Sequence, residues 1–379
     1  MSYVGDGIAT VALVLLVSQG HRATAVGGLL LAESIPALLF APVLGALADR
    51  RDRRVAMIQC ELGQALLYGA IAAWGPPYAG LLALVALATV LSRTFSAASK
   101  SAIPTLVERG ELMSANALVN TVFNLQVALG PALGGLIVAL SGSRLAVAID
   151  AGSFLVSGLI MLALPAIPPR TDGAAQRGLG ADVREGLDFV RRDRLLRTLV
   201  ITQLAFVGFA SLDNVAVVFL VRDVLHAGSL AYGAAMSAFG VGMILGAVGL
   251  VRRWASVPPA LVIAVSMLFT GAGNLLVGLS PAVVLVMLFQ MLAGIGNGLT
   301  LVGQDTLLQR HVPGHLLGRA FGAVATAVFV GSTVAYAGGG VLVDVTSPRV
   351  ALVASGIAVF VVTAAAWPTL RRAAERDPA

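Results

Sequence analysis

The segment 24–73, TAVGGLLLAESIPALLFAPVLGALADRRDRRVAMIQCELGQALLYGAIAA, determines how the rest of the chain is interpreted. Two apolar runs, 24–47 and 55–73, lie on either side of a short loop that contains four arginines and two aspartates. Each run is long enough to cross a bilayer as a helix, which takes about 20 residues. The segment therefore predicts a transmembrane hairpin whose charged loop lies in water.

The whole chain has a similar composition. Of its 379 residues, 58% are hydrophobic and 12% are charged, and the mean hydropathy is +0.91. Soluble domains are roughly a quarter charged, and a transmembrane β-barrel needs alternating rather than continuous apolar segments. We therefore exclude a soluble enzyme, a disordered chain and a barrel. Cys60 is the single cysteine, which excludes an intramolecular disulfide.

Twelve apolar runs are separated by charges or by proline and glycine. Because lipid offers the backbone no hydrogen-bond partner, each run is expected to be a helix. The predicted fold class is an all-α integral membrane protein with 12 transmembrane helices. The predicted spans are 3–19, 24–47, 55–73, 78–98, 115–140, 144–164, 198–221, 230–250, 259–279, 281–303, 320–343 and 349–368.

Topology explains the net charge of +6. If the loop after the second span is cytoplasmic, twenty basic residues lie inside, Arg93 falls within a span, and four lie outside, namely Arg22, Arg144, Arg222 and Arg349. Basic loops stay on the cytoplasmic side, so we expect both termini to be cytoplasmic. No charge is left over to support a nucleic-acid partner.

The longest loop, 165–197, divides the chain into halves. Its part 181–197 has the periodicity of an amphipathic helix, which we interpret as a solvated linker helix in preference to a regulatory site. We predict a six-helix bundle over 1–164, a second over 198–368 and a cytoplasmic tail over 369–379. A shift of 205 residues aligns the halves without a gap and places Gly134, Gly135 and Arg144 on Gly339, Gly340 and Arg349. Such parallel repeats are typical of transporters.

Each half also has an acid near the start of its first span. A shift of 207 places Asp6 on Asp213. Fifteen residues of the seventh span precede Asp213, whereas only five residues precede Asp6. We therefore expect the first helix to be truncated by about two to three turns.

The loop after the second span, Gly45-Ala-Leu-Ala-Asp49-Arg50-Arg51-Asp52-Arg53-Arg54, resembles the inner-loop signature of the major facilitator superfamily, Gly-x-x-x-Asp-Arg-x-Gly-Arg-Arg. Asp52 stands where the second glycine is usual. The resemblance implies a gating loop, formed by Gly45, Asp49, Arg50, Arg53 and Arg54, whose salt bridges break as the protein changes state. Plain anchoring by the positive-inside rule is the alternative.

Two further motifs resemble the same superfamily. Leu91-Ser-Arg93-Thr-Phe-Ser in the fourth span looks like the motif that places an arginine in a cavity-lining helix. Gly130-Pro131-Ala-Leu-Gly134-Gly135 in the fifth span resembles the signature of exporting antiporters, with Gln126 in place of its preceding glycine. The small residues permit close helix approach, and the proline permits a bend.

The stretches 104–108, 115–118, 150–154 and 184–192 resemble the efflux branch that contains enterobactin-exporter-like and macrolide-efflux-like proteins. The resemblance covers essentially the whole chain. It implies two bundles that rock about a central site and move a small molecule outward in exchange for protons. Import is the alternative direction, and a channel, a non-transporting sensor or a membrane enzyme is a further alternative.

Transport needs an energy source. Lys100, the only lysine, follows Ser99 and lies in no phosphate-binding Gly-rich loop. Unless a separate ATPase subunit is present, we therefore expect an ion gradient or the substrate's own gradient, rather than bound nucleotide, to drive transport. Proton coupling needs a carboxylate within the membrane, and the candidates are Asp6, Glu33, Glu61, Asp150, Asp213 and Asp305. We expect Asp6 paired with Arg93 to be the proton site, with Asp213 second and Glu33 a further candidate. A static ion pair is the alternative for each.

Several other residues are candidates for the cavity wall or for helix packing, namely Phe95, Asn120, Asn124, Gln126, Asn214 and Gln290. His311 and His315 have metal-like spacing, but Pro313 and Gly314 break the helix that would align them, so no metal site and no cofactor are expected. We expect a monomer in a bacterial cytoplasmic membrane, with a small molecule, protons and the lipid bilayer as its partners.

Overall fold

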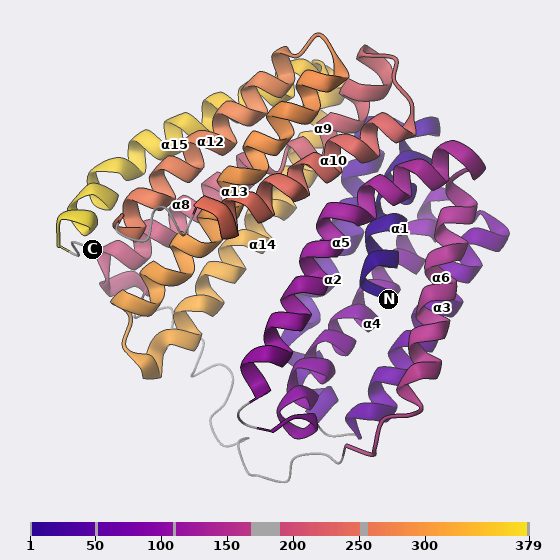
Figure 1. Ribbon diagram of the computed structural model, residues 1–379. Helices are drawn as coiled ribbons and strands as arrows, with labels where there is room; N and C mark the ends of the chain where they lie inside the picture. The colour runs from indigo at the N-terminus through magenta and orange to yellow at the C-terminus, as the bar shows by residue number, and fades with distance from the viewer. Residues whose placement is uncertain (1, 50–51, 109–110, 168–189, 251–256, 377–379) are drawn as a thin grey trace. The chain divides into compact units, whose positions relative to one another are not determined.

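The structure is a computed structural model that describes residues 2–49, 52–108, 111–167, 190–250 and 257–376. Within these ranges the chain forms helices and short connections, and none of the described residues lies in a β-strand (Figure 1). Eleven helices of the described part are long and apolar enough to cross a membrane. The helical membrane fold predicted from the sequence is therefore confirmed.

The chain divides into two compact units. The described helices of the first half belong to the first unit, which also takes in residues 228–237. They are α1 (Ser2–Gly20), α2 (Ala23–Asp49), α3 (Arg53–Trp74), α4 (Tyr78–Leu106), α5 (Leu112–Ser141) and α6 (Ser143–Met161). Each overlaps one predicted span.

The second unit contains the remaining helices. They are α8 (Arg194–Ala210), α9 (Asp213–Phe219), the π-helix η2 (Leu220–Val224), the later part of α10 (Ser229–Ile244), the π-helix η3 (Leu245–Leu250), α12 (Pro259–Leu279), α13 (Val283–His311), α14 (Gly314–Val345) and α15 (Pro348–Arg376). α13 and α15 continue beyond their predicted ends at 303 and 368. Hydropathy marks where a helix leaves lipid, not where its backbone hydrogen bonding ends.

The predicted linker helix lies mostly outside the described residues, which resume at 190. α8 begins at Arg194, within the segment predicted to be linker. Asp193 sets this boundary because its Oδ1 accepts a hydrogen bond from the Leu196 N–H at 2.8 Å. An aspartate at this capping position satisfies one of the free amides at a helix start. The transmembrane helix therefore starts earlier than hydropathy alone indicates.

The predicted seventh span is not one continuous helix. It breaks at Ser211 and Leu212, immediately before Asp213. Side chains from two other helices hydrogen-bond the carbonyls at the break: Asn274 Nδ2 donates to Ala210 O at 3.1 Å, and Ser355 Oγ donates to Phe209 O at 2.8 Å. A break within a membrane is tolerated when neighbouring helices satisfy the freed backbone groups in this way. Asp213 thus begins a new helix.

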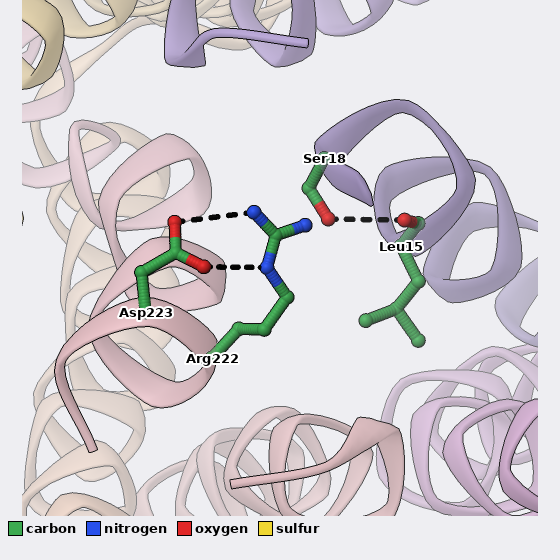
Figure 2. A network of polar contacts seen from close by, with 4 residues as sticks. All are labelled: Leu15, Ser18, Arg222 and Asp223. Atoms are coloured by element: carbon green, nitrogen blue, oxygen red, sulfur yellow. Dashed lines mark hydrogen bonds and ion pairs between the residues drawn. The ribbon is translucent and has the colours of Figure 1, made fainter. Parts of the chain in front are cut away.

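The far end of the seventh span is the π-helix η2. Arg222 Nε and Nη2 donate to the two carboxylate oxygens of the adjacent Asp223 at 2.6 and 3.1 Å (Figure 2). The Arg222 guanidinium also lies 5.6 Å from the centre of the Phe219 ring. Asp223 thus neutralises the charge of an arginine at the end of a spanning segment, where an unpaired charge would be costly. In α1, Ser18 Oγ donates to Leu15 O at 3.0 Å, which satisfies a hydroxyl within an apolar helix (Figure 2).

Close packing of small residues holds α1 within the first unit, where it contacts α5 and α6. A Cβ added to Gly7 would lie 2.9 Å from Gly130 Cα, and one added to Gly134 would lie 2.9 Å from Ile8 O. Lipid tails are as apolar as leucine, so such packing, rather than hydrophobic burial, associates helices in a membrane. α1 is therefore fixed against the helix that carries the antiporter-like motif.

In the second unit, α12 packs against α13 and α15, and α8 packs against α14 and α15. Buried hydrogen bonds link these helices. Ser266 and Thr300 hydroxyls lie 2.7 Å apart, and Gln203 Nε2 donates to Gln304 Oε1. Both pairs satisfy polar groups that lipid cannot.

Candidate functional site

The candidate site is a cavity of about 420 Å³ within the first unit. Its volume is in the range of small-molecule sites. Its wall combines charged, amide, hydroxyl and aromatic side chains from α1, α3, α4, α5 and α6. The lining residues are Ser2, Tyr3, Asp6, Glu61, Gln64, Ser92, Arg93, Phe95, Ser96, Lys100, Val119, Asn120, Phe123, Gln126 and Phe154.

The predicted pair Asp6 and Arg93 faces this cavity from α1 and α4. Asp6 interacts electrostatically with Arg93, and also with Glu61 and Glu33. Glu33, on α2, also interacts with Arg93 but does not line the cavity. The structure therefore places two of the predicted acids, Asp6 and Glu33, within electrostatic reach of the predicted Arg93.

Glu61 is a wall residue that the sequence marked only as a lesser candidate. Ser2 Oγ donates to Glu61 Oε1 at 3.5 Å, and its other carboxylate oxygen is buried without a hydrogen-bond partner in the described part of the chain. Gln64 lies one helical turn further along α3 and also faces the cavity. The wall thus carries two acids, Asp6 and Glu61, and two basic residues, Arg93 and Lys100.

Asp150 on α6 is buried behind α1 rather than in the wall. Its Oδ1 accepts a hydrogen bond from Ser153 Oγ at 3.3 Å, and its Oδ2 has no partner among the described residues. A Cβ added to Gly5 of α1 would overlap Asp150 Oδ1. Glycine at this position is therefore what lets α1 lie against a buried carboxylate one residue away from Asp6.

The polar wall follows a spacing that sequence reasoning missed. Glu61 and Gln64, Ser92 and Ser96, and Tyr3 and Asp6 are each three or four residues apart, so each pair shares a helix face. Polar pairs at this spacing in otherwise apolar runs were the available signal. Of the six predicted wall candidates, Phe95, Asn120 and Gln126 line the cavity, whereas Asn124, Asn214 and Gln290 do not.

The predicted gating loop is described in part. Gly45 and Asp49 belong to the end of α2, and Arg50 lies outside the described residues. Arg54 Nε donates to Met161 O at 3.3 Å and its Nη2 donates to Leu162 O, both at the end of α6. The Arg53 N–H donates to Ile167 O at 3.0 Å, and the Arg53 side chain is buried. These arginines attach the start of α3 to the chain that follows α6.

Asp52, which stands where the loop signature usually has its second glycine, caps α3. Its Oδ1 accepts hydrogen bonds from the N–H groups of Arg54 and Val55 at 2.9 and 3.3 Å. An aspartate immediately before an apolar run is the sequence signal for this role. The position therefore stabilises a helix start in this chain, a role that the signature does not indicate.

The antiporter-like motif faces two neighbours. Gly130 and Gly134 lie against α1, whereas a Cβ added to Gly135 would lie 2.9 Å from Gly233 Cα, in the part of α10 that belongs to the first unit. Pro131 lies within α5, and the next N–H, of Ala132, donates to Ser237 Oγ at 2.8 Å. The motif thus positions α1, and with it Asp6.

A sequence model of the family described as transmembrane secretion effector matches residues 1–377. The chain belongs to this family of major facilitator superfamily transporters. This confirms the resemblance carried by the loop and by the motifs of the fourth and fifth spans.

Relatives of this major facilitator chain include two bacterial transporters. The uncharacterized MFS-type transporter YfiS of Bacillus subtilis is 28% identical over 365 residues, which cover 91% of this chain and 84% of YfiS. The multidrug efflux pump Tap of Mycobacterium tuberculosis is 28% identical over 348 residues, 87% of this chain and 81% of Tap. The crystal structure of a bacterial homologue of the human lysosomal transporter Spinster resembles this fold with a TM-score of 0.77, at 13% identity, over 100% of this chain and 96% of that one.

The second acid of the major facilitator repeat, Asp213, has different surroundings from Asp6. It is 8% exposed, lies at the start of α9 after the helix break, and does not line the cavity of the first unit. Gln290, also in the second unit, is fully buried, and neither atom of its amide has a hydrogen-bond partner within the described ranges. The two halves therefore share a sequence repeat but not the same local geometry around the repeated acid.

Proposed function

We propose that the protein is a secondary active transporter that exports a small molecule across the bacterial cytoplasmic membrane in exchange for protons. The observation that carries this proposal is that Asp6 and Arg93 face one cavity of about 420 Å³. A carboxylate within the membrane next to a cation is what proton coupling requires. The similarity to the efflux pump Tap supports the outward direction.

Coupling follows from competition for one carboxylate. Ionised Asp6 attracts the Arg93 guanidinium, and a proton on Asp6 removes that attraction. A cationic substrate also binds the ionised carboxylate, so proton and substrate exclude each other at Asp6. A ligand that favours one state of the pair shifts the protein toward that state, and mutual exclusion makes the two fluxes opposite in direction.

The cavity wall favours a lipophilic cation as the substrate. Phe95, Phe123, Phe154 and Tyr3 offer aromatic surface beside the carboxylates of the wall. Aromatic faces attract cations, more strongly when water is excluded. Arg93 and Lys100 repel such a substrate unless the acids are ionised, which makes binding depend on proton release.

Alternating access in this proposal uses two six-helix bundles, 1–164 and 198–368, with twelve spans and both termini cytoplasmic. The sequence repeat and the cytoplasmic bias of the arginines support this arrangement. The predicted gating segment where α2 is followed by α3, with Gly45, Asp49, Arg50, Arg53 and Arg54, acts as the gate. The bonds of Arg54 to the end of α6 are surface contacts of the kind that can break and re-form at low cost.

The test uses inside-out membrane vesicles and a fluorescent lipophilic cation. An imposed proton gradient, acidic inside, should drive dye uptake by the parent protein, and a protonophore should abolish it. Asp6→Asn and Arg93→Gln should each remove the gradient-driven component. Asp305→Asn is the matched control, because Asp305 lies in a spanning helix but is exposed and does not line the cavity.

Gradient-driven uptake by Asp6→Asn equal to that of the parent would refute the assignment of the proton site. Dye expulsion from dye-loaded vesicles under the same acid-inside gradient, in place of uptake, would indicate proton-coupled import instead of export.

A further inference from the structure

A second cavity, of about 370 Å³, lies at one end of the second unit. It is formed by the start of α8 and by the ends of α13 and α15. Four of its lining residues are basic, namely Arg194, Arg310, His311 and Arg372. Thr369 adds a hydroxyl, and the remaining lining residues, Leu195, Leu307 and Ala373, are apolar.

None of the described residues that line this basic pocket is acidic. Asp193 lies nearby, but its oxygens are engaged: Oδ1 caps α8, and Oδ2 lies 2.9 Å from His311 Nε2. Glu375 bonds to Arg371 Nε at 3.0 Å, and neither residue lines the pocket. Arg194, Arg310 and Arg372 therefore bring three permanent positive charges to one small space.

The pocket lies at the level where spanning helices leave the lipid. Arg194 begins one candidate membrane span, His311 ends another, and Arg372 lies in the last turn of a third. Trp367, on α15, is 42% exposed. Tryptophan is enriched where the hydrocarbon meets the headgroups. By the arginine bias, these helix ends lie on the cytoplasmic face.

We propose that this pocket binds the headgroup phosphate of an anionic phospholipid of the inner leaflet. Arginine pairs with phosphate through charge-assisted, often bidentate hydrogen bonds. Basic pockets between transmembrane helices on the cytoplasmic side suit such headgroups. The three arginines supply the charge, Thr369 supplies a hydroxyl, and Leu195 and Leu307 supply apolar surface beside the lipid chains. The site is separate from the transport cavity and does not depend on the direction of transport.

The test measures lipid binding to the full chain in detergent by native mass spectrometry, with phosphatidylglycerol and phosphatidylcholine titrated separately. The double variant Arg194→Gln/Arg372→Gln should bind phosphatidylglycerol about 30-fold more weakly, since each arginine near a membrane surface contributes about fivefold. The matched control is Arg197→Gln/Arg371→Gln, which removes the same charge from the same two helices outside the pocket. It should bind like the parent, and phosphatidylcholine should bind all three proteins equally weakly.

Equal weakening in both double variants would mean that bulk charge alone attracts the lipid and would overturn the site. Competition with inorganic phosphate is a second test. If inorganic phosphate displaces phosphatidylglycerol at millimolar concentration, the pocket is a soluble-anion site and the lipid proposal fails. If the double variant does not fold, the single variants Arg194→Gln and Arg372→Gln should each bind about 5-fold more weakly. Unchanged binding by both would also overturn the proposal.

Discussion

The contact between α1 and α5 allows a steric prediction that needs only one added methyl group. Gly134→Ala would place a Cβ 2.9 Å from Ile8 O and 3.1 Å from Ile8 Cα, both backbone atoms. A backbone cannot rotate away as a flexible side chain can, so the two helices must separate. Overpacking of this kind costs about 1–3 kcal/mol.

The separation also weakens the rest of the interface. Moving the helices apart by about 0.5 Å loses roughly a quarter of the dispersion energy of each contact that opens. Alanine is a better helix former than glycine by up to about 1 kcal/mol, and this gain offsets part of the steric cost in the measured free energy of unfolding. Gly152→Ala corrects for this gain, because an added Cβ on this α6 residue meets nothing within 4 Å.

We therefore expect Gly134→Ala to have a free energy of unfolding about 1–3 kcal/mol below that of Gly152→Ala. The assay is reversible unfolding in mixed micelles, with thermal stability of detergent-solubilised protein as a second measurement. Because α1 carries Asp6 into the cavity, gradient-driven transport by Gly134→Ala should fall while that by Gly152→Ala should not. Equal stabilities of the two variants would refute the reasoning, since they would show that the α1–α5 contact has room for a methyl group.

Three further predictions concern caps, the helix break and pH. Asp52→Ala should destabilise the protein by about 0.5–2 kcal/mol through loss of the α3 cap. In the same unfolding assay, Asp52→Asn should retain most of the parent's stability, because asparagine also caps helices. Identical losses for both variants would argue against capping. Asn274→Ala combined with Ser355→Ala should cost about 1–3 kcal/mol, because it removes the side-chain donor to Ala210 O at the break between α8 and α9, whereas Phe209 O keeps the Leu212 N–H as a donor. A loss no larger than that of Ser332→Ala, whose hydroxyl bonds within its own helix, would contradict this account. Burial raises the pKa of Asp193, but hydrogen bonds from the Leu196 N–H and from His311 outweigh burial and lower the pKa below its ordinary value of 3.8. The ionised Asp193 carboxylate therefore stabilises the folded state fully above about pH 4, and this stabilisation is lost as the pH falls through the lowered pKa. The difference in free energy of unfolding between the parent and Asp193→Asn should therefore shrink between pH 5 and 2. A difference that stays constant over this range would refute the assignment.

The sequence was sufficient for the helical membrane fold. Apolar runs such as 55–73 and 259–279 correspond to α3 and α12. Lipid cannot hydrogen-bond the backbone, and a helix satisfies the backbone groups within the run itself. Asp6 and Arg93 were identifiable for a related reason. Charged residues within apolar runs are rare and energetically costly, so the few that occur are candidates for a functional role. The glycines of the antiporter-like motif likewise predicted close packing, which Gly130 and Gly134 show against α1.

The sequence did not reveal which faces of the helices meet. A transmembrane helix is apolar on its lipid face and on its packed face, so periodicity distinguishes the two only weakly. For that reason Glu61 and Gln64 were not recognised as neighbours of Asp6, and Asp150 was not recognised behind Gly5.

Local hydrogen bonding by distant residues was equally inaccessible. The break before Asp213 is stabilised by Asn274 and Ser355, which lie far along the chain and carry no local signal of that role. The sequence by itself thus determined that the chain crosses a membrane as helices and which charges must be accommodated there. Only the tertiary structure decided which of those charges share a cavity, because that depends on contacts between helices that are apolar on nearly every side.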